Sequence, residues 1–368
     1  MRILVTGSQG FIGKNLLVRL VELGLHQVTT FDRYSPIKNL QSLVEDADFI
    51  FHLAGENRPK DVKDFQKTNV DLTTEICKAI SQSGRKIPIV FASSTQALLE
   101  NPYGKSKLAA EKILEKLYQD TGSPIAIFRL PGVFGKWCKP HYNSVVATFC
   151  NNIANNIPIQ ISDSSTLIDL VYVDDVVMHF IDCISSAPSS CQFQNVSPQF
   201  QISLGNLAKQ IFQFKESRDT LITERVGSGL IRALYSTYIS YLPVNEFSYA
   251  LTSHSDPRGI FVEMLKTPDC GQFSYFTAHP GVTRGGHYHH SKSEKFLVIK
   301  GRALFKFRQI QTDEKYEIII EGSEPKVVET IPGWSHDITN IGSDELIVML
   351  WANEIFDRKN PDTISAKV

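Results

Sequence analysis

Residues 3–13 read ILVTGSQGFIG, an apolar run that passes into a turn with glycines at positions 7, 10 and 13. An amphipathic pattern follows directly, from Phe11 to Leu23. A strand that turns through glycines into a helix lets backbone N–H groups and the positive end of the helix face a pyrophosphate. The stretch therefore predicts a dinucleotide-binding unit, in which the residues next to the cofactor are Gly7, Gly10, Phe11, Ile12 and Gly13.

Short apolar runs alternate with longer amphipathic segments over the first 180 residues. This alternation predicts a parallel sheet with helices on both faces, an α/β Rossmann-like domain. The predicted strands lie at residues 3–7, 27–32, 49–55, 88–94 and 124–130, and the helical patterns include residues 11–23, 71–83 and 106–119.

The second half of the chain has a different pattern. From about residue 245, strand-like runs are separated by turn residues and no helical period lies between them. Such a pattern is typical of an all-β antiparallel barrel or jelly roll. Pro243 marks the natural division, so the sequence predicts two domains, residues 1–243 and 244–368.

Composition excludes several classes of function. The 368 residues carry 38 Lys and Arg against 39 Asp and Glu, which leaves no global positive field for a polyanion. The six cysteines are scattered without a CxxC pair, which favours reduced thiols. The most apolar later stretch, residues 167–184, contains four aspartates that would be costly in hydrocarbon. We therefore expect a cytoplasmic protein with no nucleic-acid binding and no membrane insertion.

Asp32 and Arg33 end the second predicted strand, and Asp32 lies 25 residues after Gly7. The carboxylate can accept a hydrogen bond from a ribose 2′-hydroxyl, which favours NAD, whereas the guanidinium can pair with a 2′-phosphate, which favours NADP. The sequence leaves both interpretations open. We expect NADPH, because biosynthetic reductions usually draw on it.

Tyr103 and Lys107 are four residues apart at the head of a predicted helix, so they share one face of it. A nearby ammonium lowers the pKa of a phenol, which can then pass a proton to a carbonyl as hydride arrives. Ser94 would steady the same oxygen, with Ser93 and Thr95 as the neighbouring alternatives. The pattern predicts a reductase site with Ser94, Tyr103 and Lys107 as catalytic residues.

These segments resemble the extended short-chain dehydrogenase/reductase family, in its nucleotide-sugar branch. The resemblance implies the catalytic roles just given, a cofactor lining formed by Leu53, Ala54 and Gly55, and a substrate region bordered by residues 129–133. It is carried by TGSQGFIG (6–13), FHLAG (51–55), ASS (92–94), YGKSKLAAE (103–111), RLPGVFG (129–135) and DLVYVDDVV (169–177).

A second candidate site, with potential metal ligands, lies in residues 281–301, GVTRGGHYHHSKSEKFLVIKG. His287 and His289 are two apart on a predicted strand and so point to one face, and Glu294 begins the next strand. His336 follows in the segment PGWSHDITN. Imidazole and carboxylate groups that converge inside a barrel can hold a divalent metal. On ligand type we expect Zn, with Fe, Mn and Ni as alternatives, in either a catalytic or a structural role.

Both histidine segments resemble the motifs of the cupin family. The first motif, G-x5-H-x-H-x4-E-x6-G, is matched from Gly281 to Gly301, and the second, G-x2-H-x3-N, from Gly333 to Asn340. The resemblance implies a metal set of His287, His289, Glu294 and His336.

The segment RGGHY at residues 284–288 also resembles the RGxHY segment of sugar-nucleotide 3,5-epimerases and ketoisomerases. That resemblance implies that His287 is a general base, which would leave His289, Glu294 and His336 as a three-ligand site. Both roles for His287 stay open. His290 would point to the opposite face of a regular strand.

Over nearly its whole length the chain resembles bifunctional enzymes of capsular-polysaccharide synthesis that make UDP-2-acetamido-2,6-dideoxy-L-talose. The resemblance implies C3 epimerisation of a UDP-4-keto-6-deoxy-N-acetylhexosamine in the cupin domain, then NADPH-dependent reduction of the C4 ketone in the N-terminal domain. Epimerisation comes first, because reduction removes the ketone that makes the C3 proton exchangeable. Analogy with both families implies a homodimer.

Two alternative functions belong to other classes of protein. One is an NAD-dependent sugar-nucleotide isomerase or dehydratase with a purely structural cupin, which would hold its cofactor tightly and consume no NADPH. The other is a non-catalytic sugar-nucleotide sensor, which the intact pair of Tyr103 and Lys107 disfavours.

Overall fold

The computed structural model describes residues 1–24, 27–186, 188–359 and 361–368, and it forms two compact units. The first unit comprises residues 1–211 and 227–243, and the second comprises residues 212–226 and 244–368. Residues 212–226 therefore pack with the second unit, although the chain on both sides of them belongs to the first.

A six-stranded parallel sheet, in the order β2-β1-β3-β4-β5-β8, forms the centre of the first unit. The chain leaves β1 for β2 on one side and comes back to β3 on the other, which creates the switch point where such sheets bind ligands. The predicted Rossmann-like fold is confirmed. The strands are β1 (Arg2–Thr6), β2 (Gln27–Phe31), β3 (Phe49–His52), β4 (Ile89–Ser94), β5 (Ile125–Leu130) and β8 (Cys191–Gln194).

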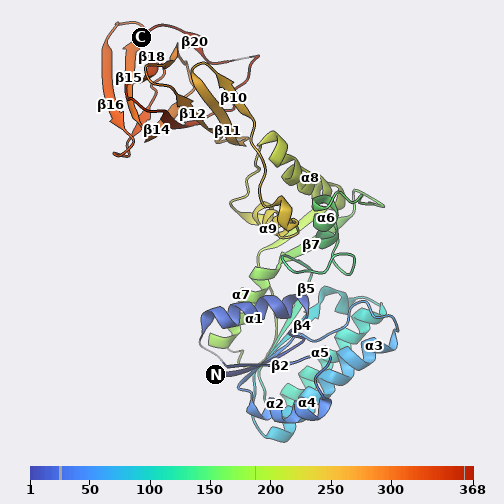
Figure 1. The fold of residues 1–368 in the computed structure, drawn as a ribbon. Helices are drawn as coiled ribbons and strands as arrows, with labels where there is room; N and C mark the ends of the chain where they lie inside the picture. The colour runs from blue at the N-terminus through green and yellow to red at the C-terminus, as the bar shows by residue number, and fades with distance from the viewer. Residues whose placement is uncertain (25–26, 187, 360) are drawn as a thin grey trace. The chain divides into compact units, whose positions relative to one another are not determined.

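Helices cover both faces of this sheet (Figure 1). On one face α1 (Phe11–Leu23) contacts α7 (Val173–Ser185), and on the other α4 (Leu72–Ser83) lies between α2 (Leu40–Asp46) and α5 (Pro102–Thr121). Strands β3 and β4 are buried along their whole length, as expected for strands covered on both sides. Four short segments complete the layer: Ile37–Asn39, α3 (Lys63–Phe65), a π-helical turn (Gln66–Asp71) and a 3-10 turn (Thr95–Leu98).

A three-stranded sheet and two helices extend the first unit beyond the main sheet. The order is β6-β7-β9, with β6 parallel and β9 antiparallel to β7. Helices α6 and α9 contact each other beside it. The elements are β6 (Gly132–Phe134), α6 (Val145–Ala154), β7 (Leu167–Tyr172), β9 (Gln199–Ser203) and α9 (Gly229–Ile239). Helix α8 (Leu204–Thr220) begins in the first unit and ends in the second, to which the 3-10 turn of Val244–Glu246 also belongs.

Two antiparallel sheets, β10-β11-β12-β19-β14-β17 and β16-β15-β18-β13-β20, form the second unit. Their inward side chains make a single core that includes Phe276, Phe296, Phe305 and Val348. This confirms the predicted all-β cupin fold. The strands are β10 (Ser253–Asp256), β11 (Gly259–Thr267), β12 (Gly271–Ala278), β13 (Thr283–Tyr288), β14 (Glu294–Lys300), β15 (Arg302–Gln309), β16 (Lys315–Glu321), β17 (Val327–Glu329), β18 (Trp334–Asn340), β19 (Leu346–Ala352) and β20 (Ile364–Ser365).

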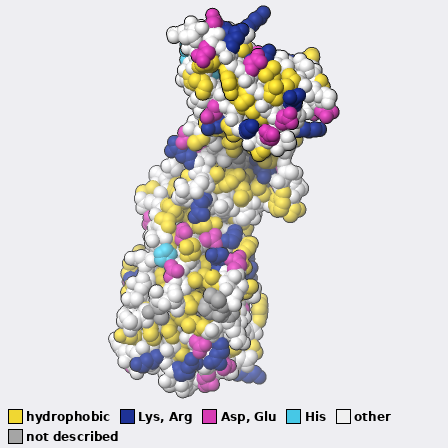
Figure 2. Space-filling model, turned by 90° about the vertical axis from the view of Figure 1, so that its left-hand side faces the viewer, with side chains coloured by type: hydrophobic (Ala, Val, Ile, Leu, Met, Phe, Trp, Pro, Cys, Tyr) yellow, Lys and Arg dark blue, Asp and Glu magenta, His cyan; other side chains and the backbone are white. Residues whose placement is uncertain are grey.

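The charges on the surface, the state of the cysteines and the character of the helices can be compared with the composition. Basic and acidic side chains are interspersed over the face drawn in Figure 2. All six cysteines lie in the described part of the chain and all are free thiols, four of them buried. Among the described residues, no helix combines the length and the apolar character needed to cross a membrane.

Candidate active sites

The turn between β1 and α1 has no room for a side chain at Gly7 or at Gly13. Gly7 has a φ of +70°, and a Cβ on it would lie 2.6 Å from Cα of Ala54. A Cβ on Gly13 would lie 2.3 Å from the carbonyl oxygen of Gly7. Helix α1 begins at Phe11 without a hydrogen bond from a capping side chain, so N–H groups of its first turn, which includes Ile12, are left to an anion.

Gly7→Ala is expected to abolish cofactor binding and to destabilise the first unit. The added Cβ meets backbone atoms of Ala54, and a left-handed φ is strained for alanine. Fluorescence titration with NADPH and thermal unfolding measure the two effects. Gly24→Ala is the matched control, because Gly24 has a similar φ of +63° with open space around its Cα. Cofactor affinity equal in the two variants would contradict this role for the turn.

The two residues that directly follow β2, Asp32 and Arg33, are the candidates for deciding between NAD and NADP. Asp32 accepts hydrogen bonds from the Ser8 hydroxyl at 2.5 Å and the Gln9 N–H at 3.2 Å, so its carboxylate faces the glycine turn. The Arg33 guanidinium lies 2.7 Å from Oε2 of Glu56, and 74% of its side chain is exposed. Glu56 also accepts from the Tyr142 hydroxyl at 2.6 Å. Arg33 is therefore held beside the turn by a carboxylate that the sequence did not single out.

A buried hydrogen-bond chain holds the segment of Leu53, Ala54 and Gly55. The Thr73 hydroxyl donates to the Asn69 carbonyl, so it must accept from Nε2 of His52 at 2.9 Å. The His52 Nδ1 then accepts from Thr6, whose oxygen also accepts from the Ala54 N–H at 3.2 Å. Burial lowers the pKa of His52 to about 3, which agrees with a neutral ring.

Asn69, in the π-helical turn, joins this segment to helix α5. Its side chain accepts from the Glu56 N–H at 2.8 Å and donates to the Glu56 carbonyl and to the Ser106 hydroxyl. Ser106 in turn donates to the carbonyl of Tyr103. The amide therefore ties the cofactor segment to the helix turn that carries the tyrosine.

Tyr103, Lys107 and Ser94 lie together at the carboxyl end of β4. The Lys107 ammonium donates to the Ala92 carbonyl at 2.9 Å, and a Cβ on Gly55 would lie only 3.0 Å from it. Burial lowers the pKa of Lys107 to about 8. Tyr103 and Ser94 share a side-chain hydrogen bond. Of the three hydroxyls considered from the sequence, the structure places the one of Ser94 beside the phenol.

The pKa of Tyr103 differs from the sequence-based expectation. Burial raises it above its ordinary value, and the hydrogen bond with Ser94 offsets only part of that rise. The ammonium of Lys107 does not lower it, because that group is directed to the Ala92 carbonyl. The phenol is therefore held in its protonated form, which is the form that donates a proton.

The side chains of Ser93 and Arg129 both contact the buried carboxylate of Glu111 on α5. The Ser93 hydroxyl donates to Glu111, and the Arg129 guanidinium pairs with both of its oxygens, the shortest contact being 2.6 Å. The Glu111 side chain is only 2% exposed. These contacts assign Ser93 and Arg129 to the packing of α5 against β4 and β5.

A cavity of about 270 Å³ lies next to these groups in the first unit. It is lined by Thr95 and by residues 131–133, 143–145 and 168–170. Residues 131–133 thus border a cavity of the size that part of a sugar nucleotide requires, whereas the Arg129 side chain is not among its lining residues.

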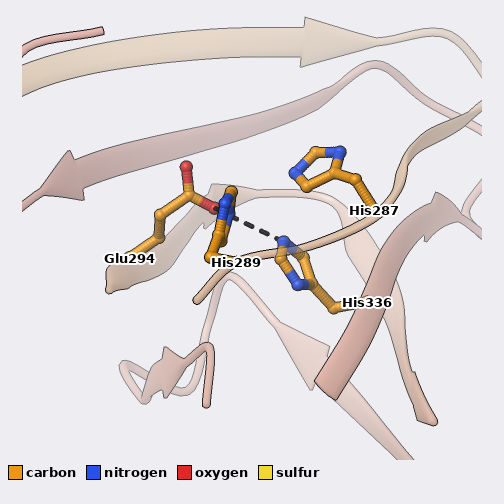
Figure 3. Close-up of side chains that lie close together, drawn as sticks. All are labelled: His287, His289, Glu294 and His336. Carbon is orange, nitrogen blue, oxygen red and sulfur yellow. Dashed lines mark hydrogen bonds and ion pairs between the residues drawn. The ribbon is translucent and has the colours of Figure 1, made fainter. Parts of the chain in front are cut away.

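In the second unit, His287, His289, Glu294 and His336 converge inside the barrel, as Figure 3 shows. Their ligand atoms all lie within 4.8 Å of one another. The Nε2 atoms of His289 and His336 lie 3.2 and 3.4 Å from the same oxygen of Glu294. Strands β13, β14 and β18 supply His287, Glu294 and His336, and His289 follows directly after β13, outside the strand on which the sequence placed it. His287 pairs with His336 in the ladder between β13 and β18.

Charge and burial favour a cation at this cluster. Burial alone would raise the pKa of Glu294, but the hydrogen bond with His289, the contact with His336 and the charge of Lys292 hold it well below its ordinary value. Burial and the neighbouring histidines lower the pKa of His287 to about 4. The cluster therefore presents an ionised carboxylate and, at His287, a neutral imidazole, which are the forms that bind metal.

Two ring nitrogens of the cluster, one on His289 and one on His336, face no hydrogen-bond donor among the described residues. Nδ1 of His289 bonds to the carbonyl oxygen of Asp362, which can only accept, so Nδ1 carries the proton. With Nδ1 as donor, the 3.2 Å contact between Nε2 of His289 and Glu294 requires either a second proton on the ring, which makes the hydrogen bond described above, or a cation between the two atoms. Nε2 of His336 is buried and has no hydrogen-bond partner among the described residues. A metal ion would satisfy both nitrogens, so these residues fit a divalent cation.

His290 stands apart from the cluster. Its ring is exposed and lies against Tyr288, with 5.4 Å between ring centroids. Two groups outside the cluster that contact it are Lys292 and Asp362, neither of which the sequence motifs indicated. Nζ of Lys292 lies 3.2 Å from the second oxygen of Glu294.

Two family models match consecutive parts of the chain. The NAD dependent epimerase/dehydratase family matches residues 3–190, and the polysaccharide biosynthesis C-terminal domain matches residues 254–364. Fold and sites together define an extended short-chain dehydrogenase/reductase joined to a cupin. The chain belongs to the NAD-dependent epimerase/dehydratase family, which assigns its first site to a nicotinamide cofactor.

Relatives share the whole arrangement, so the chain is of the CapF type. A UDP-2-acetamido-2,6-beta-L-arabino-hexul-4-ose reductase of Pseudomonas aeruginosa is 58% identical over 368 residues, 100% of this chain and 99% of that protein. The crystal structure of the capsular polysaccharide assembling protein CapF from Staphylococcus aureus matches with a TM-score of 0.92 and 39% identity, covering 100% of both chains. A CapF structure with the inhibitor 3-isopropenyl-tropolone matches at 35% identity and a TM-score of 0.87, again over 100% of both chains.

Proposed function

We propose that the chain is a bifunctional sugar-nucleotide enzyme. The cupin domain, residues 244–368, epimerises a UDP-4-keto-6-deoxy-N-acetylhexosamine at C3. The domain of residues 1–243 then reduces the C4 ketone with NADPH, which gives UDP-2-acetamido-2,6-dideoxy-L-talose for capsular polysaccharide. The observation that carries the proposal is the presence of a Tyr/Lys reductase site and a His/Glu cluster in one chain. The name of the Pseudomonas aeruginosa relative, a reductase of a UDP-linked hexul-4-ose, supports this substrate.

In the reduction step, Tyr103 donates the proton and Ser94 orients the ketone oxygen. When bound, NADPH supplies the hydride that C4 accepts. The raised pKa of the buried phenol keeps its proton in place until negative charge develops on the ketone oxygen. Lys107, held between Ala92 and Gly55, places its ammonium where the ribose of the cofactor is expected. The phenolate left after transfer is stabilised by its hydrogen bond with Ser94.

In the epimerisation step, His287 removes the proton at C3, and a proton that comes from solvent water is then added to the opposite face of C3. Its lowered pKa leaves the imidazole neutral, and it is less buried than the other three members of the cluster. His289, Glu294 and His336 then hold the divalent metal, which we propose is Zn. When bound, the metal supplies Lewis-acid polarisation of the C4 ketone. The tropolone in the CapF structure supports a metal centre, because adjacent oxygens of this kind chelate divalent cations.

The number of NADPH molecules oxidised per sugar converted distinguishes this proposal from an NAD-dependent isomerase or dehydratase with a structural cupin. We expect one NADPH to be oxidised for each UDP-4-keto sugar converted, followed by absorbance at 340 nm and by mass spectrometry of the product. The competing function requires tightly bound NAD in the purified protein and no net NADPH oxidation. That result, or unchanged substrate with added NADPH, would overturn the proposal.

NADPH is preferred over NADH because Arg33 is in place to meet a 2′-phosphate. Arg33→Ala is expected to lower kcat/KM for NADPH by about 10- to 100-fold, the effect of one charge-assisted hydrogen bond, with little change for NADH. Initial rates with the two cofactors measure the ratio. Lys38→Ala, an exposed cation on the following turn, is the control. An equal loss with both cofactors would contradict the role given to Arg33.

The protein forms a homodimer in the cytoplasm. Support for the dimer comes from the outer face of the β12-β19-β14 sheet, where Phe273, Met349 and Trp351 line an apolar hollow of about 340 Å³. A second copy offers an equally apolar face, so pairing would cover both. Sedimentation of the purified protein tests this proposal, and a monomer at micromolar concentration would contradict it. The free cysteines support the location.

A further inference from the structure

The last described segment of the chain, residues 361–368, crosses the His/Glu cluster of the cupin unit. Strand β20 pairs with β13 through His287 with Ser365 and Tyr288 with Ile364. The Ala366 N–H donates to the Gly286 carbonyl at 2.9 Å. The segment therefore adds a strand to the edge of the sheet that carries His287.

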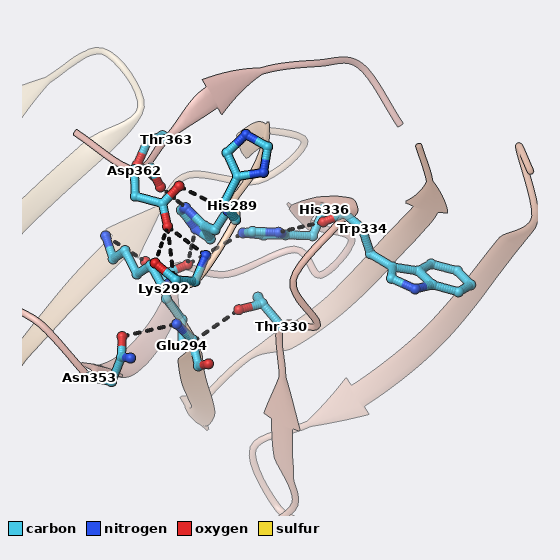
Figure 4. Close-up of polar contacts among 12 residues, drawn as sticks. His289, Lys292, Glu294, Thr330, Trp334, His336, Asn353, Asp362 and Thr363 are labelled. Atoms are coloured by element: carbon cyan, nitrogen blue, oxygen red, sulfur yellow. Dashed lines mark hydrogen bonds and ion pairs between the residues drawn. The ribbon is translucent and has the colours of Figure 1, made fainter. Parts of the chain in front are cut away.

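One residue of this segment, Asp362, bonds three consecutive residues of the loop between the two ligand strands. Its Oδ1 accepts from the His290 N–H at 2.8 Å, and its Oδ2 accepts from the N–H groups of Ser291 at 2.7 Å and Lys292 at 2.8 Å. The Ser291 hydroxyl donates to Oδ2 as well, at 3.0 Å. Figure 4 shows these bonds converging on the carboxylate. Residues 290–292 of this loop are thus held by a side chain about 70 residues away.

The backbone of Asp362 fixes the direction of His289. Its carbonyl oxygen accepts from Nδ1 of His289, and the Thr363 hydroxyl lies 3.5 Å from the same nitrogen. With Nδ1 as donor, Nε2 is left as the metal-binding atom, directed toward Glu294 and His336. The same loop carries Lys292, whose ammonium occupies the second oxygen of Glu294 at 3.2 Å and so leaves one oxygen of that carboxylate to the metal.

We propose that Asp362 is the positioning residue of the metal centre: its carboxylate shapes the 290–292 loop while its carbonyl sets the tautomer of His289. This inference rests on the proposed metal site and adds a residue that neither histidine motif contains. Partners that orient metal ligands in this way typically contribute 10- to 100-fold to metal affinity. Asp362→Asn keeps the size of the side chain but replaces one of its two acceptor oxygens by an N–H donor, so the four bonds to the loop cannot all be kept.

Titration of the metal-free full-length protein with Co²⁺ tests the inference. Asp362→Asn is expected to weaken Co²⁺ binding by about 10- to 100-fold and to change the visible absorption bands that report coordination geometry. Asp357→Asn is the matched control, because Asp357 is an exposed aspartate of the same tail that accepts a hydrogen bond from the Lys359 N–H. Circular dichroism and NADPH binding verify that both variants are folded.

The outcomes separate the two proposals. Failure of the wild-type protein to bind Co²⁺ would overturn the metal site, and the inference with it. Wild-type binding that Asp362→Asn reproduces in affinity and spectrum would overturn the inference alone. If Asp362→Asn does not fold, solid-state NMR of the wild-type protein labelled with ¹⁵N-histidine decides, since it shows which nitrogen of His289 carries the proton. A metal bound at Nδ1 would contradict the role of the Asp362 carbonyl.

Discussion

Tyr103→Phe is expected to lower the rate of NADPH oxidation by about 10²- to 10⁴-fold, the usual contribution of a general acid, while deuterium exchange at C3 continues. The variant removes one oxygen atom from a buried side chain whose hydroxyl bonds to Ser94, and it leaves the fold of α5 intact. Exchange continues because the cupin cluster is made entirely of side chains from the second unit. Absorbance at 340 nm and proton NMR in deuterated water measure the two rates.

Tyr118→Phe is the control for this experiment. Tyr118 lies on the same helix but packs against the hydrophobic core of the first unit, so its replacement should leave both rates unchanged. If Tyr103→Phe also loses exchange at C3, the two chemical steps do not belong to separate sites. If it keeps full reductase activity, another group donates the proton.

His287→Ala is expected to have the converse effect, with exchange at C3 lowered by about 10²- to 10⁴-fold. Reduction of a 4-keto sugar that already has the epimerised C3 should continue, because the Tyr103 site is untouched. His290→Ala is the control, since this exposed histidine is three residues away in sequence and outside the cluster. Full exchange in the His287 variant would place the base elsewhere.

Metal content of the same variant distinguishes the two roles of His287. If the imidazole is the base, the other three ligands retain the metal and the loss is one of exchange rate alone. If it is a fourth ligand, the variant loses metal as well as exchange. Atomic absorption of the purified variant gives the answer, with His290→Ala again as the reference.

The groups that the sequence predicted lie close together along the chain. Gly7, Gly10 and Gly13 act within a single turn, and Tyr103 and Lys107 within one turn of a helix, so regular local geometry was enough to bring each set together. His287, His289 and Glu294 meet for a similar reason, because β13 and β14 are joined by a short loop. His336 is the exception, since it lies 42 residues after Glu294 on β18 and was indicated only by its resemblance to the second cupin motif. Their roles in catalysis and metal binding stay predictions until the variants are measured.

The groups that the sequence missed act across long separations. Asn69 joins Glu56 to Ser106, which is 37 residues further along, from a π-helical turn that no apolar period indicates. Asp362 acts on His289 from 73 residues away and through its backbone as well as its side chain. A lone polar residue outside a motif carries no periodicity or spacing, so only the tertiary structure reveals these partners.

Isotope placement in the product tests the central claim most directly, namely that one ketone is used first to exchange a proton and then to accept a hydride. The UDP-4-keto sugar is incubated in deuterated water with NADPH, and the product is studied by mass spectrometry and NMR. We predict deuterium at C3, hydrogen from NADPH at C4, and exchange at C3 of the recovered substrate when NADPH is omitted. A reduced product without deuterium at C3 would contradict the proposed sequence of steps.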